Sequence, residues 1–186
     1  MEARTLLNAL ETASRLKDTT RHSWTAEGRH ESVAEHSWMM TLMAFFIRDE
    51  FPEADMDKVI RMCIIHDLGE AFTGDIPTFD KTSSHEAEEE AKLESWVRSL
   101  PETQREEMLA LYDEMAKRET LEAKIYKAID NLEAVIQHNY AGLSTWIPLE
   151  FTLNLTYGDD KVSFSDYLKK LRAEIRKDTV TKIEGD

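Results

Sequence analysis

Two histidines of the sequence occupy positions where helical periodicity places core residues. His36 lies on the apolar stripe of the segment 32–50, and His66 lies in the run MCIIHDL. Either one alone would more often be a hydrogen-bonded packing residue. Asp67, however, follows His66 directly, and an aspartate in such an apolar run is costly to bury unless it is paired or binds a cation. The group therefore indicates a metal site.

Asp130 is the predicted fourth ligand. In the run KIYKAIDNLEAVI it lies on a stripe with Ala123, Tyr126 and Ala134, where small alanines allow a close approach to other helices. Together with the other three residues it gives two imidazoles and two carboxylates. This mixed set suits Mn, Co, Fe, Ni, Cu or Zn and does not choose among them. We expect one divalent cation, with two open positions for water.

Apolar residues recur at three- and four-residue steps along most of the chain, which predicts the helices that must position these ligands. Ser32 and Glu35 have the spacing of a capping box, so one helix should begin there. No alternating strands of consequence are visible, and the predicted fold class is all-α, a multi-helix bundle. A first helix is expected to end near residue 18, and others are expected at about 32–50, from after Asp55 to about 74, at 85–100 and at 121–141. Apolar residues at 108–115 and 164–175 mark two more helices.

Three segments and the end of the chain fall outside this periodicity. Residues 19–31 and 74–81 are expected to be polar loops, and residues 146–157 to be irregular or extended. The last five residues, KIEGD, are expected to fray.

The length and charge of the chain restrict its partners. A chain of 186 residues with 41% hydrophobic content predicts a single domain over residues 1–186, with a core at about 5–142 and a C-terminal extension at 143–186. The net charge of -14 repels nucleic-acid polymers and anionic membranes. An anionic substrate would therefore need a cation or a local basic cluster at its site.

Cysteine content and hydropathy predict the cellular compartment. Cys63 is the only cysteine, so no intramolecular disulfide can form, and a cytoplasmic location is expected. The N-terminus lacks the apolar core of a signal peptide. No run approaches the roughly 18 apolar residues that a membrane span needs.

Three blocks of the sequence resemble the HD-domain phosphohydrolases, most closely the YfbR-type 5′-deoxynucleotidases. The blocks are ESVAEHSW, IIHDLGEAFTGDIP and EAKIYKAIDNLEAVIQ, and their order is retained across about residues 5–140. The resemblance implies a single HD domain, commonly a homodimer, that acts on nucleoside monophosphates. The metal signature of the family, H…HD…D, corresponds here to His36, His66, Asp67 and Asp130.

The resemblance also implies roles for two acidic residues. Glu70 matches the glutamate assigned to proton transfer, and Asp75 matches an acid that would hold the attacking water. On residue type alone, Glu70 could also be a solvated carboxylate at a helix end, and Asp75 could bond the backbone of a GDIP turn.

Arg21 and His22 are the expected substrate-binding residues. Arg21 stands fifteen residues before His36, where the resemblance implies a phosphate-binding arginine, although it could be an ordinary surface cation. His22 replaces a tryptophan that the deoxynucleotidases use to exclude ribonucleotides. Strict selectivity for deoxyribonucleotides is therefore not implied.

The expected activity is hydrolysis of a nucleoside 5′-monophosphate to a nucleoside and phosphate, and three alternatives stay open. A (p)ppGpp hydrolase typically carries a Glu-Asp pair after HD, whereas Ala71 follows Glu70 here. A two-metal HD phosphodiesterase or oxygenase needs further histidines, and only His85 lies between the HD pair and Asp130. A non-catalytic nucleotide-sensing module is the third. We expect His30, His85 and His138 to be surface or packing residues.

Overall fold

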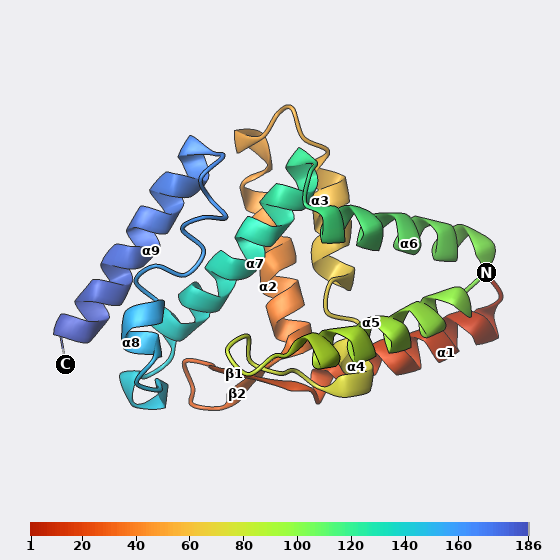
Figure 1. Cartoon of the computed structure of the whole chain (residues 1–186), viewed down its shortest axis with the longest axis horizontal. Coiled ribbons are helices and arrows are strands. Elements are labelled where there is room, and N and C mark those ends of the chain that lie inside the picture. The colour runs from red at the N-terminus through yellow and green to blue at the C-terminus, as the bar shows by residue number, and fades with distance from the viewer. Residues whose placement is uncertain (186) are drawn as a thin grey trace.

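The computed structural model describes residues 1–185 and is built mainly of helices (Figure 1). The predicted all-α class is confirmed. The two termini lie at opposite ends of the long axis (Figure 1). The α-helices are α1 (Ala3–Ser14), α2 (Val33–Phe46), α3 (Met56–Ile65), α4 (Glu70–Thr73), α5 (Ser83–Arg98), α6 (Glu102–Lys117), α7 (Leu121–Tyr140), α8 (Glu150–Leu153) and α9 (Asp166–Glu184).

Helices α2, α3 and α7 form the centre of the molecule. Each packs against the other two, α6 covers α3 and α7, and α9 packs on α7 from the other side (Figure 1). Most of the apolar side chains where these helices meet are buried, and each fully buried aliphatic or methionine side chain contributes about 1.5–3 kcal/mol. The innermost residues are Met40, Val59, Met62, Ile125, Ile129 and Leu132. In the described residues, no helix is both long and apolar enough to cross a membrane.

Side-chain caps fix where the central helices begin. The predicted capping box is present: Ser32 Oγ accepts from the Glu35 N–H, and the Glu35 carboxylate accepts from the Ser32 N–H at 2.9 Å. Thr120 caps α7 in the same way by accepting from the Ala123 N–H at 3.2 Å. These caps set the directions in which the side chains of α2 and α7 project.

Residues 19–31, predicted to be a loop, contain a small antiparallel sheet. Strand β1 (Thr20–Trp24) pairs with β2 (His30–Ser32), with Thr20 opposite Ser32 and Trp24 opposite His30. The sequence prediction was wrong here because the inward side chains are polar. Ser23 and Glu31 are both buried and bond each other at 3.0 Å, so the alternation of the strands is not an alternation of hydropathy.

Strand β1 also carries a bulge. Between the two paired positions it has four residue steps, whereas β2 has two, so two residues of β1 are extra. A bulge relaxes the rule that successive side chains point to opposite faces of a strand. As a result, Arg21 and His22, which are adjacent, both line the same cavity.

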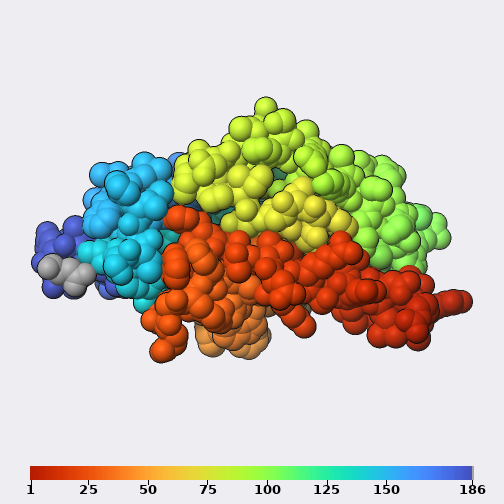
Figure 2. Space-filling view, turned by 90° about the horizontal axis from the view of Figure 1, so that it is seen from below, coloured from red at the N-terminus to blue at the C-terminus, as the bar shows by residue number. Residues whose placement is uncertain are grey.

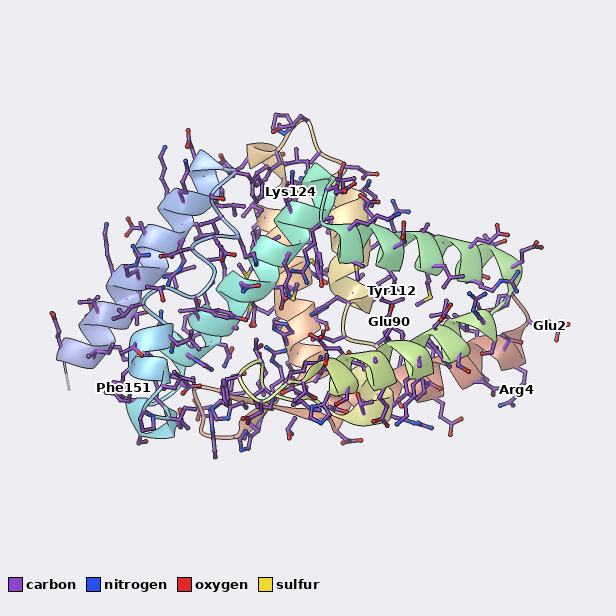
Figure 3. All side chains as sticks on the ribbon, viewed as in Figure 1. Glu2, Arg4, Glu90, Tyr112, Lys124 and Phe151 are labelled. Atoms are coloured by element: carbon purple, nitrogen blue, oxygen red, sulfur yellow. The ribbon has the colours of Figure 1, made fainter. Side chains whose placement is uncertain are left out.

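The helix predicted to run from residue 55 to about Gly74 is broken. α3 ends at Ile65, and α4 begins only at Glu70. Between them the backbone makes tight turns, with Leu68 N–H bonded to Ile65 O and Glu70 N–H bonded to Asp67 O. The side chain of Tyr112, labelled in Figure 3, donates from α6 to Ile65 O at 2.6 Å and holds the end of α3 in place.

Two further boundaries differ from the predictions. The C-terminal residues 182–184 are helical rather than frayed, because α9 continues to Glu184; Asp186 lies outside the described residues. The segment 146–157 is irregular as expected, except that it contains the short helix α8. His85 is a capping residue of α5, since its ring accepts from the Thr82 N–H at 3.3 Å.

Candidate metal centre and its cavity

Four donor atoms from three parts of the fold converge at the centre of the molecule. His36 comes from α2, His66 and Asp67 from the turn after α3, and Asp130 from α7. His66 Nε2 lies 2.9 Å from Asp67 Oδ2 and 4.0 Å from Asp130 Oδ1. His36 Nε2 lies 3.3 Å from Asp130 Oδ1 and 3.9 Å from Asp67 Oδ2. Donor atoms of His36, His66 and Asp67 lie within 4.8 Å of one another, a spacing that could hold one ion, and Asp130 Oδ1 lies beside both imidazoles.

The hydrogen bonds of the two imidazoles leave their Nε2 atoms facing this group. His66 Nδ1 donates to the backbone oxygen of Cys63 at 2.9 Å, and its buried Nε2 has no hydrogen-bond partner among residues 1–185. His36 Nδ1 donates to Glu133 Oε2 at 2.5 Å. A neutral imidazole that is oriented in this way through Nδ1 presents the lone pair of Nε2 to a metal. The donor set therefore fits a divalent cation.

The carboxylates of the group are held in the ionised form. Burial works against ionisation of Asp130, but Lys127, 2.5 Å away, and His36 keep the pKa of Asp130 well below its usual range. Burial likewise opposes ionisation of Asp67, and His66 lowers the pKa of Asp67 in spite of it. Two ionised oxygens are therefore available to a cation.

A second layer of buried acids lies behind His36, and the sequence prediction missed it. Glu133 has no exposed surface, and one of its oxygens, Oε1, has no hydrogen-bond partner in the described chain. Burial, and then the charge of Glu133, raise the pKa of Glu31 to about 7. The sequence did contain a signal for Glu133, because this charged residue lies on the apolar face of α7, just as His36 lies on the apolar stripe of its helix.

Arg21 reaches the metal donors from strand β1. Its Nη1 lies 3.5 Å from Asp67 Oδ2, and its Nε lies 3.5 Å from Glu31 Oε2. Burial disfavours the charge, yet Asp67 and Asp75 raise the pKa of Arg21 above its ordinary value. The guanidinium is therefore charged and borders the donor group, which is the position needed to bind a phosphate beside a cation.

Glu70 and Asp75 lie next to the same group. The helix predicted from residue 55 to about 74 would have carried both His66 and Glu70. This prediction was wrong, because Glu70 begins α4 after the break. It is 4% exposed, and burial together with the charges of Asp67 and Asp75 raises the pKa of Glu70 to about 10. A carboxyl group that keeps its proton near neutral pH can serve as a general acid.

These residues open into a cavity of about 590 Å³, a volume typical of small-molecule sites. On the face drawn in Figure 2, three segments of different colour meet: the orange strand region, the yellow segment after α4 and the cyan segment around α8. Each contributes to the cavity lining. His138, expected to be a surface or packing residue, also lines the cavity, as do Lys127, Glu150 and Asn154.

Comparisons with known proteins agree with this architecture. The 5′-deoxynucleotidase HDDC2 of Homo sapiens is 34% identical over 140 residues, which are 73% of this chain and 67% of that protein. The 5′-deoxynucleotidase hdd1 of Schizosaccharomyces pombe is 31% identical over 136 residues, which are 69% of this chain and 68% of that protein. The structure of a predicted metal-dependent phosphohydrolase from Magnetospirillum magnetotacticum superposes with a TM-score of 0.80 at 26% identity, over 96% of this chain and 95% of that one.

The family assignment follows from the extent of these matches. The HD domain family matches residues 13–172, a span that includes all four donors and most of the cavity lining. The resemblance drawn from the sequence blocks is therefore confirmed. The chain belongs to the HD-domain family.

Proposed function

We propose that this protein is a divalent-metal-dependent phosphomonoesterase that hydrolyses nucleoside 5′-monophosphates, a 5′-deoxynucleotidase. The observation that carries the proposal is the convergence of His36, His66, Asp67 and Asp130 beside Arg21, at one end of a cavity that can hold a nucleotide. The names of the relatives from Homo sapiens and Schizosaccharomyces pombe support the substrate class.

The four donors would hold one cation, with Mn, Co, Fe, Ni, Cu and Zn as the candidates for its identity. Such a cation would supply Lewis acidity, which favours ionisation of water and stabilises charge on the phosphoryl group. Glu31, His36 and Glu133 form a second group with the spacing of metal ligands. It shares His36 with the four donors, but Glu133 contacts the other ring nitrogen of His36, Nδ1. That nitrogen already donates to Glu133, which supports a site for one cation rather than two.

The residues around the donors have distinct tasks in the proposed reaction. Arg21 binds the phosphate oxygens that face away from the donors and offsets part of the negative field of the protein. Asp75 orients the water whose oxygen attacks phosphorus. As the bond from phosphorus to the 5′-oxygen breaks, Glu70 gives its proton to that oxygen. The water delivers its oxygen with one proton to phosphorus, and its other proton passes through solvent to restore Glu70, so the products are a nucleoside and hydrogen phosphate.

A screen of phosphate esters tests the proposal. The protein is incubated with Mn²⁺ or Co²⁺ and with dAMP, AMP, a phosphodiester or pyrophosphate, and released phosphate is measured. We expect release from the monophosphates alone. Hydrolysis of the diester or of pyrophosphate instead would favour the other HD activities, and no hydrolysis of any compound would favour a sensing module.

We also propose that the chain forms one cytoplasmic domain that assembles as a homodimer. Large apolar side chains that stay exposed support a protein interface: Phe46 is 71% exposed on α2, and Trp38 and Tyr140 line a second hollow of about 260 Å³. Sedimentation equilibrium should give twice the chain mass for the wild type. The variant Trp38→Glu should shift it toward the monomer.

A further inference from the structure

A buried carboxylate in the cavity has one oxygen without a hydrogen-bond partner. Glu150 stands at the start of α8, is only 2% exposed and lines the cavity. Its Oε2 accepts from the Ile147 N–H at 2.8 Å, which fixes the carboxylate. Its Oε1 has no hydrogen-bond partner within residues 1–185. Because an unpaired buried carboxylate oxygen is costly, this atom indicates a place where a ligand supplies the missing donor.

Two imidazoles flank this oxygen without satisfying it. His22 Nε2 lies 3.0 Å and His138 Nε2 lies 3.4 Å from Glu150 Oε1, but neither points along a hydrogen-bond direction. The Asn154 amide group contacts His138 Nδ1 through Nδ2 at 3.0 Å and Oδ1 at 3.3 Å, which holds the ring beside the recess. Burial lowers the pKa of His138 and favours its neutral form. The oxygen is thus an acceptor in a polar recess of the cavity.

The position of this recess identifies the part of the ligand that reaches it. Arg21, at the donor group, and His22, at Glu150, are consecutive residues of bulged β1, and both line the cavity. In a nucleoside monophosphate the sugar directly follows the phosphate, and it carries hydroxyl groups that can donate. An apolar or aromatic group would not satisfy Glu150.

We propose that Glu150 Oε1 accepts a hydrogen bond from a sugar hydroxyl of the nucleotide, which makes Glu150 a specificity-determining residue. The inference rests on the proposed function for the identity of the ligand. The wall that carries Glu150 is pre-formed, because buried Arg172 donates to the backbone oxygens of Asn154, at 2.9 Å, and Tyr157, at 3.0 Å. A pre-formed acceptor discriminates strongly against a ligand that lacks the donor.

The test compares AMP, which carries both sugar hydroxyls, with 2′,3′-dideoxyadenosine monophosphate on the wild type and on Glu150→Gln. Binding is measured by calorimetry in EDTA, so that hydrolysis does not interfere, and turnover is measured separately with Mn²⁺. The wild type should bind AMP about tenfold to a hundredfold more tightly than the dideoxy compound. In Glu150→Gln the amide oxygen must keep the bond to the Ile147 N–H, so a donating NH2 group replaces Oε1. The preference should then fall to about twofold or less, while binding of the dideoxy compound stays unchanged. Glu86→Gln, at the exposed rim of the same cavity, is the matched control.

The outcomes separate this inference from the proposed function. If Glu150→Gln loses affinity equally for both nucleotides, Glu150 has a structural role and the inference is overturned. A wild type that binds both nucleotides equally well would also overturn it, and this second result does not depend on whether the variant folds. A hydroxyl-dependent preference without phosphate release would support the sugar contact and contradict the hydrolase. The 2′-deoxy and 3′-deoxy monophosphates then identify which hydroxyl is bound.

Discussion

The two walls of the cavity are built by different means. The donor wall presents its chemistry from α2, α7 and the turn after α3, beside the apolar side chains that these helices bury in the core. The wall of residues 146–161 is mostly irregular, and its shape depends on two arginines of α9. The candidate metal donors thus lie on two packed helices and in the turn that ends a third, whereas Glu150 lies on a segment held by distant polar contacts.

This difference shows which contacts fix the positions of the side chains in each wall. Donors on packed helices are placed by the burial of many apolar side chains, so no single contact decides their position. In the second wall, Asp159 pairs with both Arg172, at 3.1 Å, and Arg176, at 2.5 Å. Because few contacts hold that wall in place, the loss of one of them should change its shape more than the loss of one apolar contact changes the donor wall.

The largest expected effect comes from removing a donor. Asp67→Ala should abolish bound metal and lower turnover of dAMP by about a thousandfold or more, because the ion that stabilises the transferring phosphoryl group is lost. Metal content by mass spectrometry and phosphate release are the measurements. Asp113→Ala, an exposed carboxylate on α6, should retain both. Metal-free turnover by Asp67→Ala would contradict the assignment of the donor wall.

The second wall should be broken by one substitution in α9. Arg172→Met leaves the carbonyls of Asn154 and Tyr157 without their donor and removes one of the two arginine partners of Asp159, and we expect a loss of about 3 kcal/mol in the free energy of unfolding. Urea denaturation measures it, and Lys170→Met on the exposed face of α9 is the control. Metal content should stay at the wild-type level. Loss of metal in Arg172→Met would mean that the two walls are not separable.

A smaller effect is expected behind the donors. Glu133→Ala removes the acceptor of the His36 Nδ1–H and should weaken metal binding about tenfold to a hundredfold. Glu133→Gln should lose less, because its amide oxygen still accepts. Competition with a chelating dye measures the affinity, and Glu122→Ala in the first turn of α7 is the control. An unchanged affinity in Glu133→Ala would leave the second layer without a role in metal binding.

The smallest effect concerns the pH dependence of the metal-free donor wall. Burial raises the pKa of Glu70 from 4.5 in the unfolded chain to about 10, so the folded protein holds a proton that the unfolded chain releases. Between these two values the contribution of Glu70 to stability therefore falls as pH rises, by up to about 1.4 kcal/mol per pH unit. In EDTA, Glu70→Gln should show a flatter fall of the unfolding free energy from pH 6 to 8. Parallel curves for both proteins would contradict a protonated Glu70.

The same contrast decides what the sequence could predict. The all-α class and the convergence of His36, His66, Asp67 and Asp130 followed from polar residues that interrupt apolar stripes. The strands around Ser23 and the break after Ile65 did not, because polar inward side chains and tight turns leave no hydropathy pattern. The recess at Glu150 depends on contacts with β1 and α7, which local periodicity does not contain.

The bulge in β1 has a consequence for how the protein can change over generations. In a regular strand, neighbouring side chains face opposite ways, and only one of two adjacent positions can serve a given ligand. Here the extra residues let positions 21 and 22 line one cavity. In the proposed site, the residue after Arg21 can therefore mutate and change the preferred sugar without moving the arginine that binds the phosphate.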